Sequence, residues 1–371
     1  MNLLLEELSG ANGARLGIAT LNAEKTLNAL TLPMIEGLLG QLRAWANNPR
    51  ITCVLLRGNG AKAFCAGGDV VGLVQACRAR PGEVPAFAAQ FFAAEYRLDH
   101  ALHVFEKPLL CWGHGYVLGG GLGLLQGAGV RIVTPSSRLA MPEISIGLYP
   151  DVGAGWFLPR LPGKLGLFLG LTGAQVNASD ALALGLADRL LGEAQQDALI
   201  DGLLQLNWQD QVPQQLNSLL RALEHQASTP RPEGQWLGHR VLIDDALDVA
   251  DASAAYKAIA RWQQHPAAEL AKAAENLAKG CPLTARLWWQ HYHRSRRLSV
   301  AEVLRMDYAL SLNCCRHPEF AEGVRARLID KDHSPHWHWP DLCGIPATVV
   351  QAHFSKVWEG RHPLADLGSY A

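Results

Sequence analysis

The N-terminal part of the chain has short, largely apolar runs that are separated by Gly and Asn. Residues 2–8 and 14–21 are predicted to be two strands, and residues 11–13 (Ala-Asn-Gly) between them are a hairpin signal. Apolar side chains then recur at helical spacing over residues 32–45. The apolar run over residues 51–57 that follows predicts a buried strand.

A strand, a glycine-rich loop and a helix occur twice in the first third of the chain. After the strand just described, the loop at residues 58–69 leads into a helix predicted over residues 70–77. In the second set, the apolar run over residues 109–117 predicts one inward-pointing strand. The glycine triplet at residues 119–121 then permits a tight turn, and a short helix is expected over residues 122–126.

Helical signals dominate the remainder of the chain. A helix is predicted over residues 87–102, and nearly every signal over residues 193–327 is helical. Further helices are expected at residues 164–171, 177–184, 267–279 and 300–312, and a strand at residues 187–191. Strands first and helices later favour an α/β core over residues 1–195 and a helical extension over residues 196–371. The C-terminal 40 residues, rich in His, Trp and Pro, should pack back on the core.

Composition excludes two classes of partner. The 371 residues are 49% apolar and only 18% charged, so a large part of the chain is expected to be buried in the fold or in subunit contacts. Lys and Arg number 33 against 34 Asp and Glu. This balance provides no field for steering the protein onto nucleic acid or an anionic membrane, so an anionic ligand must be bound by local groups.

The cysteines and the N-terminus indicate a reducing compartment. The eight cysteines are scattered and include no C-x-x-C pair, a pattern typical of reduced thiols. The first seven residues include two glutamates at positions where a signal or transit peptide requires basic side chains. We therefore expect a cytoplasmic protein without such a peptide, or a mitochondrial matrix protein if a transit peptide has been removed.

The two glycine loops could together supply an oxyanion hole. Backbone amides from residues 64–69 (Phe-Cys-Ala-Gly-Gly-Asp) and from the helix start at residues 119–121 can converge on one oxygen atom. Beyond them, Glu143 and Asp151 lie in a Pro- and Gly-rich loop of the kind that presents side chains to an active site. An amide hole and two carboxylates together indicate acyl chemistry. Each loop alone is weak evidence, because most glycine turns after strands are structural.

Two other enzyme classes do not fit the spacing of these loops. Neither loop satisfies G-x-G-x-x-G, and no G-x-x-x-x-G-K-[ST] occurs, so a nucleotide-binding site is not indicated. The nucleophile elbow G-x-S-x-G of serine hydrolases is also absent.

Three short motifs resemble the enoyl-CoA hydratase/isomerase (crotonase) superfamily. They are residues 63–69 (Ala-Phe-Cys-Ala-Gly-Gly-Asp), residues 118–123 (Leu-Gly-Gly-Gly-Leu-Gly) and residues 141–143 (Met-Pro-Glu), and the resemblance spans residues 10–195. It implies an α/β fold of the ClpP/crotonase type, a spiral of β-β-α units, here followed by a C-terminal helical region.

Two positions depart from the hydratase members of that superfamily. Gly123 stands where similar hydratases carry a glutamate, and Asp151 stands where they usually carry glycine. A hydratase needs two carboxylates, whereas a thioester hydrolase needs one carboxylate, an oxyanion hole and a means of recognising the acyl group. Five further motifs resemble the branch that hydrolyses 3-hydroxyisobutyryl-CoA: residues 28–32, 95–96, 147–153, 322–332 and 334–337.

The resemblance assigns roles to five residues. The oxyanion donors would be the amides of Gly68 and Gly120, and Glu143 would be the catalytic carboxylate, acting as nucleophile or as base for water. Asp151 would orient the 3-hydroxyl group of the substrate or help protonate the leaving thiolate. Glu95 matches a family glutamate near the substrate, and it could equally be a structural acid on its helix.

The CoA moiety is expected to bind near the first glycine loop. Lys25 and Lys62 are candidates for contacts with its phosphates, and Ala63 and Ala66 for contacts along the loop. Lys25 and Lys62 are interpreted equally well as solvated surface lysines.

Other residues of chemical interest have structural interpretations. Asp69 is best explained as the cap of the helix that follows it, and Cys65 as a structural residue, since the sequence reveals no partner that would lower its pKa. Three His and one Cys lie within residues 333–343, but their spacing fits no common structural zinc site. The basic residues 291–297 are best explained as a solvated helix end.

The predicted function is hydrolysis of a short β-hydroxyacyl-CoA thioester, with 3-hydroxyisobutyryl-CoA of valine breakdown as the expected substrate. An enoyl-CoA hydratase or isomerase and a non-catalytic CoA-binding protein are the alternatives. No metal or redox cofactor is implied, since coenzyme A is part of the substrate. Neither nucleic acid nor a membrane is expected as a partner, and homo-oligomerisation and substrate breadth are left open.

Overall fold

A computed structural model describes residues 2–226 and 230–368, and in it the chain forms two compact units, each assembled from three segments. Unit 1 comprises Met1–Gly68, Ala101–Leu139 and Val176–Leu237, and unit 2 comprises Asp69–His100, Ala140–Gln175 and Gly238–Ala371. The units therefore do not follow the predicted division at residue 195. Residues 196–226 pack on the sheet of unit 1, whereas two earlier segments group with the C-terminal helices.

A six-stranded sheet forms the centre of unit 1. The strands lie in the order β1-β2-β3-β5-β7-β10, with bounds Leu3–Ser9, Arg15–Leu21, Ile51–Gly58, Leu109–Gly113, Val130–Val133 and Arg189–Leu190. The predicted hairpin is confirmed, since β1 and β2 pair antiparallel with Ser9 opposite Arg15. All other neighbours in this sheet are parallel, as crossover connections require.

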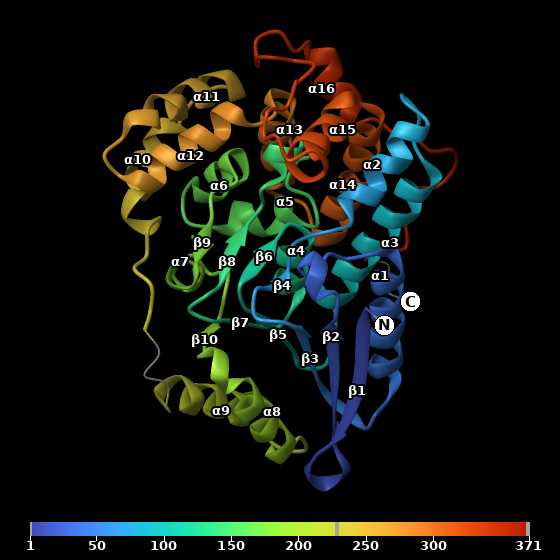
Figure 1. The fold of residues 1–371 in the computed structure, drawn as a ribbon. Coiled ribbons are helices and arrows are strands. Elements are labelled where there is room, and N and C mark those ends of the chain that lie inside the picture. Colours follow the sequence, from blue (N-terminus) through green and yellow to red (C-terminus); the bar gives the residue numbers. More distant parts are fainter. Residues whose placement is uncertain (1, 227–229, 369–371) are drawn as a thin grey trace. The chain divides into compact units, whose positions relative to one another are not determined.

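Helices cover both faces of this sheet. On one face, α8 (Gln196–Gln205) and α9 (Val212–Gln226) contribute Leu203 and Leu220 to an apolar cluster with Trp112 of β5 (Figure 1). Successive residues of a strand point to opposite faces. Gly17 of β2 accordingly faces the other side, where its Cα lies so close to the Trp45 ring of α1 (Leu32–Asn47) that a Cβ would come within 2.9 Å of it.

A second, four-stranded sheet corrects the prediction of one strand over residues 109–117. That run forms two strands in different sheets, β5 and β6, which are separated at Gly115. Gly115 has a φ of +56°, and a Cβ there would collide with the main-chain carbonyl of Lys62. The second sheet has the order β4-β6-β8-β9, with bounds Ala63–Cys65, Tyr116–Leu118, Arg138–Ala140 and Val176–Asn177.

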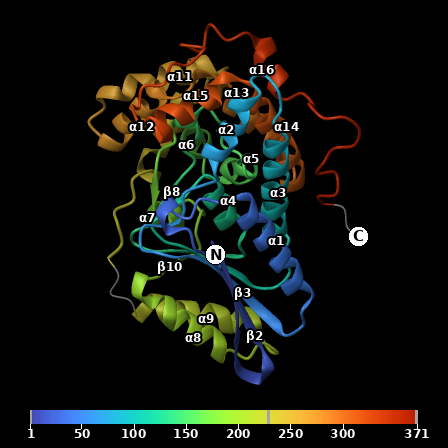
Figure 2. The ribbon, with the colours of Figure 1, turned by 45° about the vertical axis from the view of Figure 1, so that its right-hand side comes forward.

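Unit 2 is built from helices, as the sequence predicts for most of its segments. Figure 2 shows α13, α14 and α15 near α2 and α3, and Tyr308 of α14 donates a hydrogen bond to the Ala89 carbonyl of α3. The bounds are Val70–Ala79 (α2), Ala86–His103 (α3), Ala154–Phe157 (α5), Leu165–Thr172 (α6), Arg240–Ala246 (α10), Ala252–Ala260 (α11), Ala268–Lys279 (α12), Pro282–Ser295 (α13), Val300–Arg316 (α14), Pro318–Val324 (α15) and Ala347–His353 (α16). In the described part of the chain, no helix is both long and apolar enough to cross a membrane.

The C-terminal segment packs on the helices of unit 2. Arg97 of α3 donates to the Pro363 carbonyl at 2.7 Å, and Arg305 of α14 donates to the Leu367 carbonyl at 2.7 Å. Leu364 and Leu367 are buried. Side chains from two helices therefore satisfy main-chain groups of a segment with little secondary structure of its own.

Candidate active site

The two predicted oxyanion donors lie in adjacent loops of unit 1. Leu30 pairs with Gly68 in a short parallel bridge and donates to the Gly67 carbonyl, so the Gly68 amide points away from Leu30. Gly67 has a φ of +108°, and a Cβ there would lie 3.5 Å from the Leu118 carbonyl oxygen and 3.9 Å from the Gly120 nitrogen. The loop that carries Gly68 thus passes directly beside the loop that carries Gly120.

Gly120 is the first residue of the helix α4 (Gly120–Gly127). The N-cap, Gly119, has a φ of +49° and offers no side-chain cap; its carbonyl accepts from the amides of Leu122 and Gly123, whereas the amides of Gly120 and Gly121 have no intrahelical acceptor. A Cβ on Gly121 would collide with Cys65, and this explains why a glycine stands inside the helix. Buried Cys65 therefore packs against the helix start, which agrees with its structural interpretation.

The residues predicted to bind CoA lie on two segments that touch each other in unit 1. Lys25 and Lys62 are exposed. The Ala66 amide donates to the Leu27 carbonyl, and the Asn28 side chain donates to the Ala63 carbonyl at 3.0 Å. The two lysine-bearing segments are thus joined, while the contact with CoA itself stays a prediction.

The predicted carboxylates gather in unit 2. Glu95, Glu143 and Asp151 are 3%, 5% and 4% exposed. Burial first, then the negative charge of Asp307, raises the pKa of Asp151 to about 7. Burial and the charge of Asp151 likewise raise the pKa of Glu143 and of Glu95 well above the usual range. At least part of this group therefore holds protons at neutral pH.

Two further acids, absent from the predicted site, belong to the same group. Asp99 lies one turn after Glu95 on α3, and neither oxygen of its buried carboxyl has a hydrogen-bond partner in the described structure. Burial, followed by the charge of Glu95, raises its pKa strongly. The second acid is fully buried Asp307 on α14. We call Glu95, Asp99, Glu143, Asp151 and Asp307 the carboxyl cluster.

Hydroxyl groups connect two members of the carboxyl cluster. Tyr96 donates to Asp151 at 2.7 Å and lies 2.6 Å from the Ser311 hydroxyl. Ser311 is in turn 3.0 Å from the hydroxyl of Tyr149, which donates to the Asp307 main-chain carbonyl at 2.8 Å. All three hydroxyl-bearing residues are fully buried. We call Tyr96, Ser311 and Tyr149 the hydroxyl chain.

The far end of the hydroxyl chain is fixed by a histidine. His291 Nε2 lies 2.6 Å from Asp307 Oδ1, with both side chains fully buried. The other carboxyl oxygen of Asp307 accepts from the Gly153 amide at 3.1 Å and so anchors the loop that carries Asp151. Gly155 in α5, which follows that loop, admits the imidazole, because a Cβ there would collide with the ring of His291.

The predicted structural role of Asp69 is confirmed, because it is the N-cap of α2 and accepts from the Gly72 amide at 3.0 Å. Residues 291–295 form the end of α13, where His291 is buried and not solvated as the sequence suggested. In residues 2–226 and 230–368, no group of three or more His, Cys, Asp or Glu side chains is arranged to hold a metal ion.

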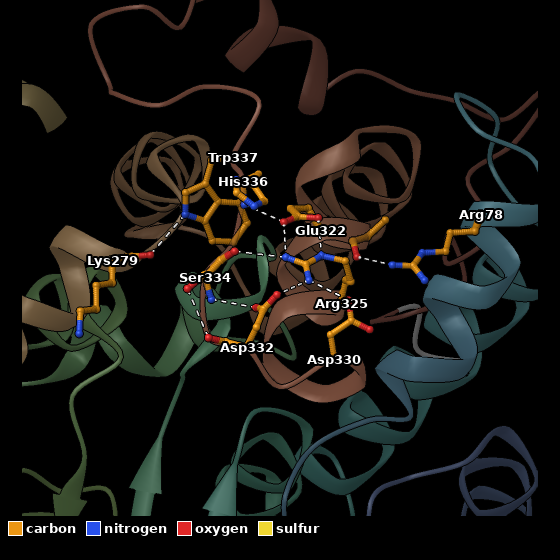
Figure 3. A network of polar contacts seen from close by, with 10 residues as sticks. Arg78, Lys279, Glu322, Arg325, Asp330, Asp332, Ser334, His336 and Trp337 are labelled. Atoms are coloured by element: carbon orange, nitrogen blue, oxygen red, sulfur yellow. Dashed lines mark hydrogen bonds and ion pairs between the residues drawn. The ribbon is translucent and has the colours of Figure 1, made fainter.

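The motif over residues 322–332 is organised by one arginine. Figure 3 shows Arg325 donating to Glu322, Asp330 and Asp332, at 2.8, 2.8 and 2.5 Å, and to the Ser334 carbonyl at 3.2 Å. Glu322 also accepts from the amide of His336. The acids that stand out in the sequence therefore fix the chain after α15.

Sequence reasoning missed Asp99, Asp307, Ser311 and His291. Asp307 and Ser311 had a detectable signal, because polar residues one turn apart interrupt an apolar helix over residues 300–312. Asp99 likewise follows Glu95 at helical spacing. No comparable signal marks His291, which lies in a basic run.

The chain matches known proteins along almost its whole length. Residues 16–354 match the family model described as enoyl-CoA hydratase/isomerase. A zebrafish (Danio rerio) protein named 3-hydroxyisobutyryl-CoA hydrolase, mitochondrial, is 36% identical over 92% of this chain and 88% of its own. The human (Homo sapiens) protein of the same name is 35% identical over 92% of this chain and 86% of its own.

The fold is also similar to that of a solved structure. The crystal structure of a carnitinyl-CoA dehydratase from Mycobacterium thermoresistibile has a TM-score of 0.84 and 30% identity, covering 96% of this chain and 97% of that one. The predicted crotonase-like fold class is thus confirmed. The chain belongs to the enoyl-CoA hydratase/isomerase family, in the branch that contains the 3-hydroxyisobutyryl-CoA hydrolases.

Proposed function

We propose that this chain hydrolyses 3-hydroxyisobutyryl-CoA to 3-hydroxyisobutyrate and free CoA, a step of valine breakdown. The observation that carries the proposal is the 36% identity with the zebrafish hydrolase over 92% of this chain. Release of free thiol from 3-hydroxyisobutyryl-CoA by the purified protein tests it. A protein that binds the thioester and releases no thiol would contradict it.

In the proposed reaction, the thioester carbonyl oxygen accepts from the amides of Gly68 and Gly120. Negative charge forms on that oxygen when the carbonyl carbon is attacked, and donors placed in advance stabilise it. The carboxylate of Glu143 either takes a proton from the attacking water or attacks the carbon itself; in the second case loss of the thiolate leaves an anhydride with Glu143, which water then hydrolyses to the free acid and the carboxylate of Glu143. The bond between carbon and sulfur then breaks, and the CoA thiolate receives a proton, for which Asp151 is the proposed donor.

The electrostatics of the carboxyl cluster suit a pair of acids with different tasks. Glu143 must be ionised to attack or to act as a base, and burial beside Asp151 raises its pKa, which increases its basicity. Asp151, with a pKa of about 7, is protonated in part of the molecules near neutrality. It can therefore supply a proton in one step and accept one in another.

Asp151 is also the proposed reader of the 3-hydroxyl group. A buried polar group that is built to bind a substrate hydroxyl discriminates strongly against an analogue that lacks it. The methyl group that separates 3-hydroxyisobutyryl-CoA from 3-hydroxypropionyl-CoA should matter less, about 1 to 3 kcal/mol. We therefore expect activity on both 3-hydroxyacyl thioesters.

A second candidate is hydration or dehydration of an acyl-CoA, which the 30% identity with the carnitinyl-CoA dehydratase favours. Such an enzyme needs two carboxyl groups. Gly123 removes one familiar position for them, but Glu95, Asp99 and Asp151 provide other acids in the same unit as Glu143. Release of free CoA separates the candidates, since hydration leaves the thioester intact.

We further propose that the reaction needs no metal or redox cofactor, because the proposed steps use only amides and carboxyl groups. A chelator should leave the turnover unchanged. An acyl-CoA is the substrate class that the family name supports. The similar relatives are named mitochondrial. For this chain we propose a cytoplasmic location, with the mitochondrial matrix as the alternative, and cell fractionation distinguishes the two.

A further inference from the structure

The hydroxyl chain between Asp151 and Asp307 has no role in the reaction proposed above. Its distances form an unbroken series: 2.7 Å from Asp151 to Tyr96, 2.6 Å on to Ser311 and 3.0 Å on to Tyr149. Tyr149 then reaches the Asp307 main-chain oxygen at 2.8 Å and one carboxyl oxygen of Asp307 at 3.4 Å. Buried polar groups that are linked in this way polarise one another.

Counting the protons shows that the hydroxyl chain has two complete arrangements. When Asp151 is a carboxylate, Tyr96 donates to it and Ser311 donates to Tyr96, each with its single proton, and Tyr149 donates to the Asp307 carbonyl. When Asp151 is protonated, its own O–H can donate to Tyr96. In that state Tyr96 can donate to Ser311, Ser311 to Tyr149, and Tyr149 to the Asp307 carbonyl. Every hydroxyl donates once in both arrangements, so neither leaves a buried O–H without an acceptor.

We propose that Tyr96, Ser311 and Tyr149 are positioning residues that link the carboxyl group of Asp151 to the buried Asp307–His291 pair. Through this link, residues that do not touch Asp151 determine how readily it takes up and releases its proton. The inference rests on the proposed function in one respect only, namely that Asp151 gives and takes up a proton during the reaction. The bonds on the two sides of Tyr96 reverse their direction when Asp151 changes its protonation state, while Tyr149 donates to the Asp307 carbonyl in both states.

The surroundings of Asp151 make the link consequential. The titratable groups that face it are Glu95, Tyr96 and Asp99 from α3, Glu143 and Tyr149 from its own segment, Asp307 and Cys314 from α14, and His291 through Asp307. In the described structure, His291 is the one basic side chain with a recorded bond to the carboxyl cluster. Among the described residues, Tyr96 is the one side chain that bonds the Asp151 carboxyl, beside a main-chain hydrogen bond within Asp151 itself, so a change in the Tyr96 bond acts on the acid directly.

The test measures the titration of Asp151 without using activity. The infrared C=O stretch of protonated carboxyl groups is followed across pH, and the part that is lost in Asp151→Asn is assigned to Asp151. The hydrogen bond from Tyr96 favours the carboxylate, so Tyr96→Phe should move this titration upward by about one to two pH units. Ser311→Ala and Tyr149→Phe, which remove hydroxyls one and two links away, should move it upward by a few tenths of a unit.

Tyr308→Phe is the matched control. Tyr308 is a buried tyrosine on the same helix as Ser311, and its hydroxyl donates to the Ala89 carbonyl outside the hydroxyl chain. It should leave the titration of Asp151 unchanged. If Ser311→Ala and Tyr149→Phe behave like Tyr308→Phe, the link beyond Tyr96 does not exist. If Tyr96→Phe also leaves the titration unchanged, the inference fails entirely.

The same variants separate this inference from the proposed function. If thiol release is absent in the wild type while the infrared titration shifts as described, the hydrolase assignment is wrong and the link is real. If the wild type hydrolyses the thioester, the pH profile of kcat should shift in the same direction as the titration, with KM unchanged. Since Tyr149→Phe removes a single oxygen atom, it serves as the second variant where Ser311→Ala fails to fold.

Discussion

The Tyr96 hydroxyl donates a hydrogen bond of 2.7 Å to the Asp151 carboxyl, and both groups are buried. This bond lowers the pKa of Asp151, while burial and the charge of Asp307 raise it, and the balance places it at about 7. A carboxyl group with this pKa exists in both forms under physiological conditions. Asp151 can therefore act on a substrate as an acid or as a hydrogen-bond acceptor, and the predictions below distinguish the two.

Asp151→Asn should separate substrate selection from chemistry. If Asp151 reads the 3-hydroxyl, the variant loses more activity with 3-hydroxyisobutyryl-CoA than with isobutyryl-CoA, which lacks that hydroxyl. A hydrogen bond to a charged group contributes about 1.5 to 3 kcal/mol, so the ratio of kcat/KM values should fall about ten- to a hundredfold. An equal loss on both substrates would instead assign Asp151 to proton delivery.

Glu143→Gln should abolish most thioester hydrolysis while CoA binding survives. The amide keeps the volume of the side chain and removes the nucleophile or base, so turnover should fall about a hundredfold or more. Glu319→Gln is the matched control, because Glu319 is another buried acid of unit 2 that lies outside the carboxyl cluster. Retention of more than about a tenth of the turnover in folded Glu143→Gln would exclude a catalytic role.

Gly120→Pro removes one proposed oxyanion donor and keeps the helix start, where proline is tolerated. One such donor contributes about 10²- to 10³-fold to turnover. The measurement compares kcat with the affinity for a non-hydrolysable CoA thioether, which reports whether the binding site is intact. Normal turnover in a variant that binds the thioether would show that the Gly120 amide is not a donor.

Asp99→Asn should stabilise the protein at high pH. The pKa of Asp99 in the folded state lies well above its unfolded value. Its contribution to stability is therefore fully present below the unfolded pKa, near 4, and is lost as pH rises through the raised folded pKa. The difference between the Tm of the variant and that of wild type should increase between about pH 4 and about pH 8. Each kcal/mol of stability that wild type loses over this range should appear as about 2 to 4 °C in that difference.

The control for this experiment is Asp197→Asn, since Asp197 is exposed on α8. It reports the Tm change that an Asp→Asn substitution causes at an exposed position, against which the pH dependence of Asp99→Asn is compared. A Tm difference for Asp99→Asn that depends on pH no more than that of the control would mean that the Asp99 carboxyl is not held in its protonated form.

Arg325→Ala should loosen the segment after α15 without unfolding the protein. Arg325 bonds three carboxylates and the Ser334 carbonyl, so residues 330–336 lose their common anchor (Figure 3). Amide hydrogen exchange in that segment should become faster, while exchange in α14 stays unchanged. Arg325→Lys should behave nearly like the alanine variant, because an ammonium group cannot bind several carboxylates in the fork geometry of guanidinium.

Local sequence patterns predicted the helices and strands well, because hydrophobic spacing and turn residues act within a short stretch of chain. The helical spacing at residues 32–45 and the hairpin signal at residues 11–13 correspond to α1 and to the β1–β2 turn. The strand over residues 109–117 failed because apolar character does not reveal where the backbone bends. That bend depends on the close approach of the Lys62 carbonyl to Gly115, two segments that are distant in sequence.

The candidate site was predictable only where short motifs carry it. Glu143, Asp151 and the two glycine loops stand in recognisable stretches, whereas Asp307 acquires its significance through its bond to Gly153, 154 positions away, and His291 through its bond to Asp307. The grouping into two units was missed for the same reason. The amino-acid composition of residues 196–226 does not reveal that α8 and α9 pack on the sheet.

The discontinuous make-up of unit 2 has a consequence for how the protein folds as it is synthesised. Tyr96, Tyr149 and Asp151 leave the ribosome long before Asp307 and Ser311, which bury and bond them. Until α14 emerges, the carboxyl cluster remains hydrated and the loop around Gly153 has no anchor. A nascent chain that stops before residue 300 can complete its sheet but not this acid-rich interior, and its exposed apolar helices would be substrates for chaperones.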